Sequence, residues 1–496
     1  MLYHEIIEQH PAQAPALIFN DVVINYEEFR RRVKAWAAFL QEKGLQKGEK
    51  VGLLSKNCSE FVVAYFAVIK AGGVIVPFNY QLAMPEVAYI LQDSQIRFLI
   101  STNEVPVQPA LEEIGYQVQL QQFRYGDLDA GDEAMFKAVP GEEHENCTII
   151  YTSGTTGKPK GAMLSHRNLV ENAKAYCEAI GVHQGDHSLC VLPMYHCFGW
   201  TCSVTGPLYM GGCIVAQQVY AVAKAVELIQ KYKVDIFCGV PTMMQMLLED
   251  AKPEELARVR FFFSGGASLP QKVSKDFTLK FGCPVQEGYG LSETSPVVSL
   301  TPLHLIKVGS IGRSIGGVQV EIRDEQDHKL PVGVVGELCV KGPNVMLGYL
   351  NKPEETAEAM RGGWFHTGDM AYEDEDACFF IVDRLKDMII AAGENIYPRE
   401  IEELLYHHPA IKEVAVVGVP DKLRGQAVAA YVVLRDGMTA SKPELRKFIK
   451  GKVANYKLPK YFVFMDQLPK NNTGKILKRA LRERGIEDMV NRVARK

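Results

Sequence analysis

The chain has 496 residues, of which 47% are hydrophobic and 23% charged, and its net charge is −4. This composition is ordinary for a soluble globular protein of two or more domains, and the small negative charge argues against nucleic acid as a partner. The eleven cysteines are scattered and form no Cys-x-x-Cys pair, which argues against disulfide frameworks and zinc ribbons. The sequence has no run of 18 apolar residues and its first residues do not resemble a secretory leader, so we expect a cytoplasmic protein.

Strands and helices are predicted to alternate through the first half of the chain. Asn25 with Glu28 forms a capping box, and apolar residues then recur at helical spacing until Gly44. After it we expect strands at 51–54, 74–77, 97–100, 188–192 and 236–239 and helices at 61–70, 85–92, 168–180 and 222–232. This alternation predicts right-handed β-α-β units and a mostly parallel, covered sheet, with only short elements in the weakly patterned region 101–145.

The pattern changes from about residue 308, where glycines separate short β-rich runs at 319–323 and 336–341. These runs predict a small barrel-like or antiparallel subdomain. A charged segment at 381–387 is followed by a helix at 398–406, strands at 414–418 and 429–434, a helix near 443–451 and a basic tail. The predicted fold class is α/β, with a large N-terminal domain of mixed α/β layers (residues 1–384) and a smaller C-terminal α+β domain (residues 385–496).

The most informative loop follows a buried strand predicted at 149–151 and reads TSGTTG over residues 152–157. Its two glycines let backbone N–H groups approach an oxyanion closely, and its four hydroxyls supply further donors. Lys158 and Lys160 add positive charge, so the loop is a cradle for polyphosphate. It is not a Walker A loop, because only two residues separate its glycines and Pro159 follows Lys158.

Other strings further along the chain carry chemistry of their own, although each alone is more often a turn or a solvated segment. In GYGLSE (288–293), Tyr289 can stack on a purine and Glu293 can hold a magnesium ion. In GWFHTGD (363–369), Asp369 can accept the two vicinal hydroxyls of a ribose. The remaining strings are SGGA (264–267), DRLKD (383–387), PKNNTGKI (469–476) and PMYHCFGW (193–200).

The stretch from Tyr151 to His166 closely resembles the phosphate loop of the adenylate-forming ligases, and the other strings resemble motifs of that family in the family's order. The resemblance spans nearly the whole chain. It implies that ATP and Mg²⁺ bind here, with Thr152 and Glu293 as metal ligands. The ATP- and AMP-binding residues that it implies are Thr152, Ser153, Gly154, Thr155, Thr156, Lys160, Gly266, Ala267, Gly288, Tyr289, Gly290, Ser292, Asp369 and Arg384.

The same resemblance implies roles for residues outside the nucleotide site. The implied catalytic residues are Lys475, Glu293 and His196. His196, Trp200 and Gly265 would border the acyl pocket, with Trp200 closing a tunnel. The C-terminal domain would swivel about Lys386, presenting the Lys475 loop for adenylation and the segment with Ala392 and Gly393 for thioester formation.

The sequence is thus expected to encode an ATP-dependent acyl-CoA ligase for medium- or long-chain fatty acids, with a carboxylic acid, ATP and coenzyme A as its partners. Two alternatives remain open: a ligase that loads a carrier protein, and a coenzyme A ligase for an aryl or short branched acid. A non-catalytic nucleotide-binding protein is a third alternative, which the joint presence of Thr152, Glu293, Asp369, Arg384 and Lys475 disfavours. Peripheral membrane contact and a homodimer are also left open.

Overall fold

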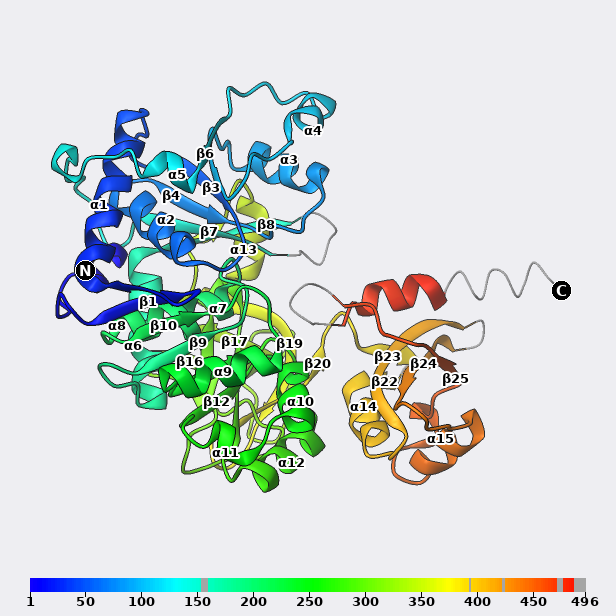
Figure 1. The fold of residues 1–496 in the computed structure, drawn as a ribbon. Coiled ribbons are helices and arrows are strands. Elements are labelled where there is room, and N and C mark those ends of the chain that lie inside the picture. The colour runs from blue at the N-terminus through cyan, green and yellow to red at the C-terminus, as the bar shows by residue number, and fades with distance from the viewer. Residues whose placement is uncertain (153–158, 392–393, 422–423, 471–475, 486–496) are drawn as a thin grey trace.

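Figure 1 shows the fold in a computed structural model that describes residues 1–152, 159–391, 394–421, 424–470 and 476–485. A large body, coloured blue to yellow, contains the N-terminal part of the chain, and a smaller body, coloured orange to red, lies beside it. Strand β20 (Phe379–Arg384) ends the first body and β21 (Ile389–Ala391) begins the second.

The largest sheet of the first body has nine strands among the described residues. In sheet order they are β15 (Arg313–Ser314), β14 (Val297–Leu300), β13 (Val285–Gly290), β12 (Phe261–Ser264), β11 (Ile236–Gly239), β9 (His187–Cys190), β10 (Cys213–Ala216), β1 (Pro15–Phe19) and β2 (Val22–Asn25). The strands from β13 to β1 are parallel, and those at the two edges are antiparallel. The carboxyl ends of β11, β12 and β13 therefore meet at one edge, which is where ligands bind in open α/β sheets.

A second sheet, of seven strands within the described ranges, belongs to the same body. Its order is β18 (Gly348–Tyr349), β8 (Lys160–Ser165), β7 (Asn146–Thr152), β4 (Val74–Pro77), β3 (Lys50–Leu54), β5 (Phe98–Ser101) and β6 (Gln121–Arg124). The predicted phosphate loop joins β7 to β8, and these two strands pair antiparallel. Strand β18, from a distant part of the chain, also pairs antiparallel with β8.

The predicted antiparallel subdomain is a separate sheet, of four strands in the described part of the chain. Its order is β16 (Gln319–Arg323), β17 (Gly336–Lys341), β19 (Phe365–Glu373) and β20. All three pairings are antiparallel, and β16 and β17 have the bounds that the sequence predicted. The mixed α/β architecture expected from the sequence is confirmed.

Helices cover the sheets of the first body, and the second body has helices of its own (Figure 1). Their bounds are α1 (Tyr26–Glu42), α2 (Ser59–Lys70), α3 (Met84–Asp93), α4 (Gln108–Glu113), α5 (Tyr125–Leu128), α6 (His166–Ile180), α7 (Cys197–Trp200), α8 (Gly206–Tyr209), α9 (Val222–Tyr232), α10 (Pro241–Asp250), α11 (Pro253–Leu256), α12 (Gln271–Phe281), α13 (Pro353–Ala359), α14 (Pro398–Tyr406) and α15 (Lys442–Ile449). Asn25 caps α1 by accepting the Glu28 N–H, as predicted. The Glu28 side chain does not complete the capping box, because its carboxylate instead pairs with Arg31 and Arg32.

The second body has its own sheet, of five strands among the described residues. These are β22 (Glu394–Ile396), β21, β24 (Gly425–Leu434) and β23 (Ile411–Asp421), with β25 (Tyr461–Phe464) alongside β24. Its buried apolar residues form two clusters, whose first members in the chain are Ile389 and Ala415. The last buried residue in the main cluster of the first body is Phe379, so the two bodies have separate cores.

Candidate active site

Asp369 lies at the centre of a cluster that joins three segments far apart in the sequence. Its Oδ2 accepts a hydrogen bond of 2.5 Å from the Tyr289 hydroxyl, and its Oδ1 lies 3.2 Å from Nε of Arg384. Tyr289 lies near the end of β13, Asp369 lies in β19, and Arg384 pairs with Asp369 from the end of β20. The structure thus brings together three residues predicted to bind AMP, and the central residue, Asp369, is only 3% exposed.

Glu293, the predicted magnesium ligand, lies in the short helix Ser292–Thr294 that follows β13. Its Oε1 accepts a hydrogen bond of 2.9 Å from the Tyr349 hydroxyl, and its backbone carbonyl accepts the Met346 N–H. Burial raises the pKa of the Glu293 carboxyl above its ordinary value. Tyr349 is a site residue that the sequence did not single out, because only the pairing of β18 with β8 brings it here.

Lys160 and Thr152 lie on the strand pair β7–β8, which neighbours the Glu293 segment. The Lys160 ammonium lies 5.1 Å from the centre of the Tyr349 ring, which is cation–π distance. Thr152 pairs with Lys160 across β7 and β8, and β8 contacts the helix that carries Glu293. Carboxylate and hydroxyl oxygens are the donors that Mg²⁺ prefers, so the Glu293 and Thr152 side chains suit the predicted metal.

The turn after β12 carries Gly265, Gly266 and Ala267 to the sheet edge beside Tyr289. Gly266 has φ +77° and, like Ala267, is exposed, so the turn offers its backbone to a ligand. A Cβ on Gly265 would lie 3.0 Å from the Phe198 ring. Gly290 is required by packing, because a Cβ there would lie 2.0 Å from the Pro296 carbonyl oxygen, and Gly288 is tight against Phe263 for a similar reason.

His196 caps the short helix α7, because its Nδ1 accepts the Phe198 N–H at 3.2 Å. The next residue, Cys197, places its Sγ 3.2 Å from the Ser292 hydroxyl. This contact joins the predicted acyl-pocket segment to the predicted nucleotide motif, and the sequence did not indicate it. Burial raises the pKa of the Cys197 thiol to about 12, so the group is a neutral hydrogen-bonding partner of Ser292 and not a thiolate.

Several predicted site residues lie outside the described residues. They are Ser153, Gly154, Thr155 and Thr156 of the phosphate loop, Ala392 and Gly393 of the predicted coenzyme A segment, and Lys475. Their roles remain predictions. The described residues on either side, Thr152 and Lys160, end β7 and begin β8.

Comparison with known protein families shows which family the chain belongs to. Residues 3–350 match the family described as AMP-binding enzyme, and residues 400–475 match the AMP-binding enzyme C-terminal domain. The chain belongs to this adenylate-forming family. It is an acyl-activating enzyme, that is, an AMP-forming acid–thiol ligase, as its motifs implied.

Relatives of this AMP-binding enzyme act on different acids according to their names. It is 37% identical to a long-chain-fatty-acid–CoA ligase of Bacillus subtilis, with 95% of this chain and 92% of the relative covered. It is 36% identical to a feruloyl-CoA synthase of an Amycolatopsis species, with 95% and 96% covered.

Among solved structures, ATP-bound MatB of Rhodopseudomonas palustris is 30% identical to the chain and superposes with a TM-score of 0.92 over 98% of this chain and 99% of MatB. The same protein without ligand superposes with a TM-score of 0.81 over the same shares of both chains.

Trp200, which the resemblance implies as the residue closing an acyl tunnel, is buried in an aromatic cluster. Its indole is 2% exposed, and its Nε1–H donates to the Tyr3 hydroxyl at 2.8 Å. The ring stacks on Tyr65 with centroids 3.9 Å apart and packs near Phe61 and Phe66. The short motif did not indicate that this aromatic cluster, formed by the N-terminal segment and α2, surrounds the indole, and the tunnel role of Trp200 stays a prediction.

The described lysines near Lys475 are engaged within the C-terminal body. Lys470 forms an ion pair with Glu413, and the partly buried Lys478 lies 2.8 Å from Glu402. Lys386, the predicted hinge, is exposed between Arg384 and Asp387. Asp387 pairs with Arg482, and the Leu385 N–H donates to the Gly368 carbonyl, so the connection is held by contacts on both of its sides.

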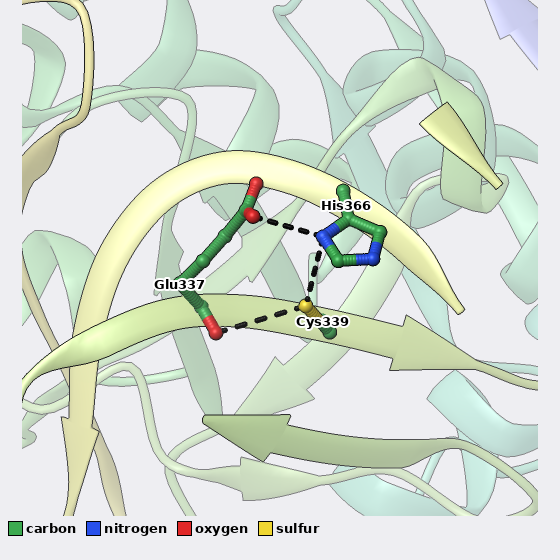
Figure 2. Close-up of side chains that lie close together, drawn as sticks. All are labelled: Glu337, Cys339 and His366. Atoms are coloured by element: carbon green, nitrogen blue, oxygen red, sulfur yellow. Dashed lines mark hydrogen bonds and ion pairs between the residues drawn. The ribbon is translucent and has the colours of Figure 1, made fainter. Parts of the chain in front are cut away.

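A cluster of Glu337, Cys339 and His366 lies between β17 and β19, next to the Asp369 segment (Figure 2). The His366 Nδ1 lies 2.8 Å from the Glu337 carboxylate and 3.4 Å from the Cys339 sulfur. These residue types can ligate a metal, but an Arg361 guanidinium lies 2.9 Å from the same Glu337 oxygen. Burial also raises the pKa of the Cys339 thiol to about 12. The cluster is therefore described as a hydrogen-bonded network, in which the other His366 nitrogen, Nε2, lies 3.2 Å from an Asp327 carboxylate oxygen.

The helices in the described part of the chain are too short or too polar to cross a membrane.

Proposed function

We propose that this AMP-binding enzyme joins a medium- or long-chain fatty acid to coenzyme A through an acyl-AMP intermediate. The convergence of Tyr289, Asp369 and Arg384 is the observation that carries the nucleotide part of this proposal. Tyr289 would offer a face to adenine, and Arg384 would contact the phosphate region. Each carboxylate oxygen of Asp369 has a second lone pair, so it can accept a ribose hydroxyl while it keeps its present partner.

The reaction places no need for a general base on these residues, because a carboxylate is already a nucleophile. It attacks the α-phosphorus of ATP, pyrophosphate leaves, and the thiol of coenzyme A then displaces AMP from the acyl adenylate. The protein must orient the carboxylate and neutralise phosphate charge. Mg²⁺ bound by Glu293 and Thr152 would supply part of this neutralisation. Lys160 would supply more, from its position above Tyr349.

We infer that the domains are residues 1–384 and 385–496, with Lys386 as the hinge. The separate cores on either side of the connection support this division. The TM-score of 0.92 to ATP-bound MatB, against 0.81 to the same protein without ligand, favours a domain arrangement like that of the ATP-bound relative. In this proposal Lys475 serves adenylation, and rotation about Lys386 then brings Ala392 and Gly393 to the site for thioester formation.

The acyl group is assigned to the region of His196 and the turn at Gly265. The side chains that border this turn are apolar: Phe198 contacts Gly265, and Val240 lies 3.8 Å from a Cβ built on Gly266. Met243 and Met244 of α10 lie beside Gly239, at the end of the neighbouring strand β11. Such a border favours an apolar acyl chain over a charged one. An aryl acid is the second candidate, since a feruloyl-CoA synthase is almost as similar as the fatty-acid ligase.

The proposal is tested with purified enzyme, ATP, Mg²⁺ and a panel of acids: decanoate, palmitate, ferulate and malonate. Carboxylate-dependent ATP–pyrophosphate exchange reports the first step, and AMP release with coenzyme A reports the second. Decanoate or palmitate is expected to give the highest kcat/KM. A higher value for ferulate or malonate would refute the fatty-acid assignment. Exchange without AMP release until a phosphopantetheinylated carrier protein is added would favour carrier loading.

A further inference from the structure

The strand that carries Asp369 departs from regular pairing at the site itself. Strand β19 pairs with β17 through His366 opposite Cys339 and Met370 opposite Glu337. Between these two pairs, β19 has three residues (Thr367, Gly368 and Asp369) where β17 has one. This is a β-bulge, which turns side chains away from their regular direction. Gly368 has φ +71°, a backbone conformation that glycine adopts without strain.

The Glu337 side chain braces this bulge from the facing strand. Its Oε1 accepts the Gly368 N–H at 2.9 Å. Its Oε2 lies 2.8 Å from His366 Nδ1 and 2.9 Å from an Arg361 nitrogen (Figure 2 shows the His366 contact). Both carboxylate oxygens are therefore in use, and the side chain is 13% exposed. An unpaired N–H in the bulge would otherwise cost free energy.

The bulge positions two parts of the structure: the Asp369 side chain and the connection to the second body. Asp369 leaves it to contact Tyr289 and Arg384, and its own N–H donates to the Thr367 hydroxyl at 3.1 Å. The Gly368 carbonyl accepts the Leu385 N–H at 2.9 Å, directly before the inferred hinge. A shift of Gly368 would therefore displace both the carboxylate and the connection between the two domains.

We propose that Glu337 is a positioning residue for ribose recognition: it fixes the bulge that aims the Asp369 carboxylate. The proposal rests on the proposed function, since it takes Asp369 as the group that binds the ribose hydroxyls. Arg361 and His366 hold Glu337 in place, and Glu337 itself does not touch the nucleotide.

The experiment compares ATP with 2′-deoxy-ATP and 3′-deoxy-ATP in carboxylate-dependent pyrophosphate exchange. The preference for ATP is the ratio of kcat/KM values measured on one enzyme preparation, so any loss of folded protein cancels. Glu337→Ala is expected to lower this preference about tenfold, the value of one well-placed hydrogen bond to a charged group. Glu337→Gln keeps an oxygen for the Gly368 N–H and is expected to retain most of the preference.

Glu321→Ala is the matched control. Glu321 lies opposite Cys339 in the same sheet and pairs with Arg323, but it does not contact the bulge. Its preference for ATP is expected to equal that of the wild type. If Glu337→Ala does not fold, Glu337→Asp takes its place, because the shorter side chain cannot reach both Gly368 and Arg361.

An unchanged preference in Glu337→Ala or, failing that, Glu337→Asp would overturn the proposal, as would a wild-type enzyme that does not distinguish ATP from its deoxy analogues. A wild-type enzyme without exchange on any acid is a different result, because it refutes the proposed function itself.

Discussion

Two buried carboxylates of the site, Asp369 and Glu293, are held in different ways. Asp369 contacts a guanidinium on one oxygen and a hydroxyl on the other. Glu293 accepts a hydrogen bond from the neutral hydroxyl of Tyr349, and burial raises its pKa. The difference indicates that Asp369, the proposed ribose-binding acid, is fixed before a ligand arrives. Glu293, the proposed metal-binding acid, is instead placed where an incoming cation would stabilise its charge.

Replacing Glu293, whose carboxylate contacts a neutral hydroxyl and not a guanidinium, is expected to have the largest effect on activity. Glu293→Gln keeps the shape of the side chain and an acceptor for Tyr349 but cannot supply a charge to Mg²⁺. We expect exchange to fall by about two to three orders of magnitude, the usual cost of losing a main electrostatic contribution. The assay is ATP–pyrophosphate exchange at several Mg²⁺ concentrations. If Glu293→Gln exchanged at the wild-type rate at low Mg²⁺ concentration, Glu293 would not be a metal ligand.

Asp369→Asn tests the second of the two carboxylates. The amide can keep one contact, to Tyr289 or Arg384, but loses the charge that pairs with the guanidinium. The KM for ATP is expected to rise by about 10- to 100-fold, with a smaller change in kcat, because a bond to a charged group contributes about 1.5–3 kcal/mol. Steady-state kinetics at saturating acid measures both. If kcat instead fell by this factor and KM stayed unchanged, Asp369 would have a role in the chemical step.

Tyr349→Phe sharpens the comparison by removing the partner of Glu293 while the ring beneath Lys160 remains. Residues that orient metal ligands typically contribute about 10- to 100-fold to metal affinity. We expect the Mg²⁺ concentration at half-maximal exchange to rise about tenfold. Tyr372→Phe is the control, because this tyrosine lies opposite Phe380 in the antiparallel sheet and stacks on its ring. The same Mg²⁺ requirement in both variants would leave Tyr349 without this role.

Glu287 is a third buried carboxyl, on β13, where the two bodies meet. Burial raises its pKa to about 7, and Arg399 and Glu403 of α14 face it, the first lowering and the second raising that pKa. Its ordinary pKa is 4.5, so folding holds a proton that the unfolded chain releases between pH 4.5 and about 7. The native state is therefore destabilised as pH rises through this window.

Glu287→Gln stays neutral and is expected to remove this dependence. The variant should match the wild type near pH 4.5 and become more stable at pH 8, by at most about 3 kcal/mol. Melting temperatures of both proteins across this range measure the effect. A difference that is constant with pH would show that the Glu287 carboxyl does not titrate in this window.

Local patterns predicted many elements with the bounds that the structure has. Helices α9 and α14 and strands β4, β11, β16 and β17 agree with the sequence. Strand β23 is longer than predicted, from Ile411 to Asp421, because it pairs along its length with β24. The motif around Trp200 likewise did not indicate the aromatic residues that pack against its indole.

The sequence by itself determined the order of the motifs, most helices and strands, and the chemical identity of the groups that an adenylating site requires. These properties depend on residues that are neighbours in the chain or recur within one element. Only the tertiary structure decided which groups meet: Tyr349 with Glu293, Cys197 with Ser292, and Glu337 with the Gly368 bulge. Each of these contacts depends on the pairing or packing of segments far apart in the chain, and the energy that selects such partners is not present in either segment alone.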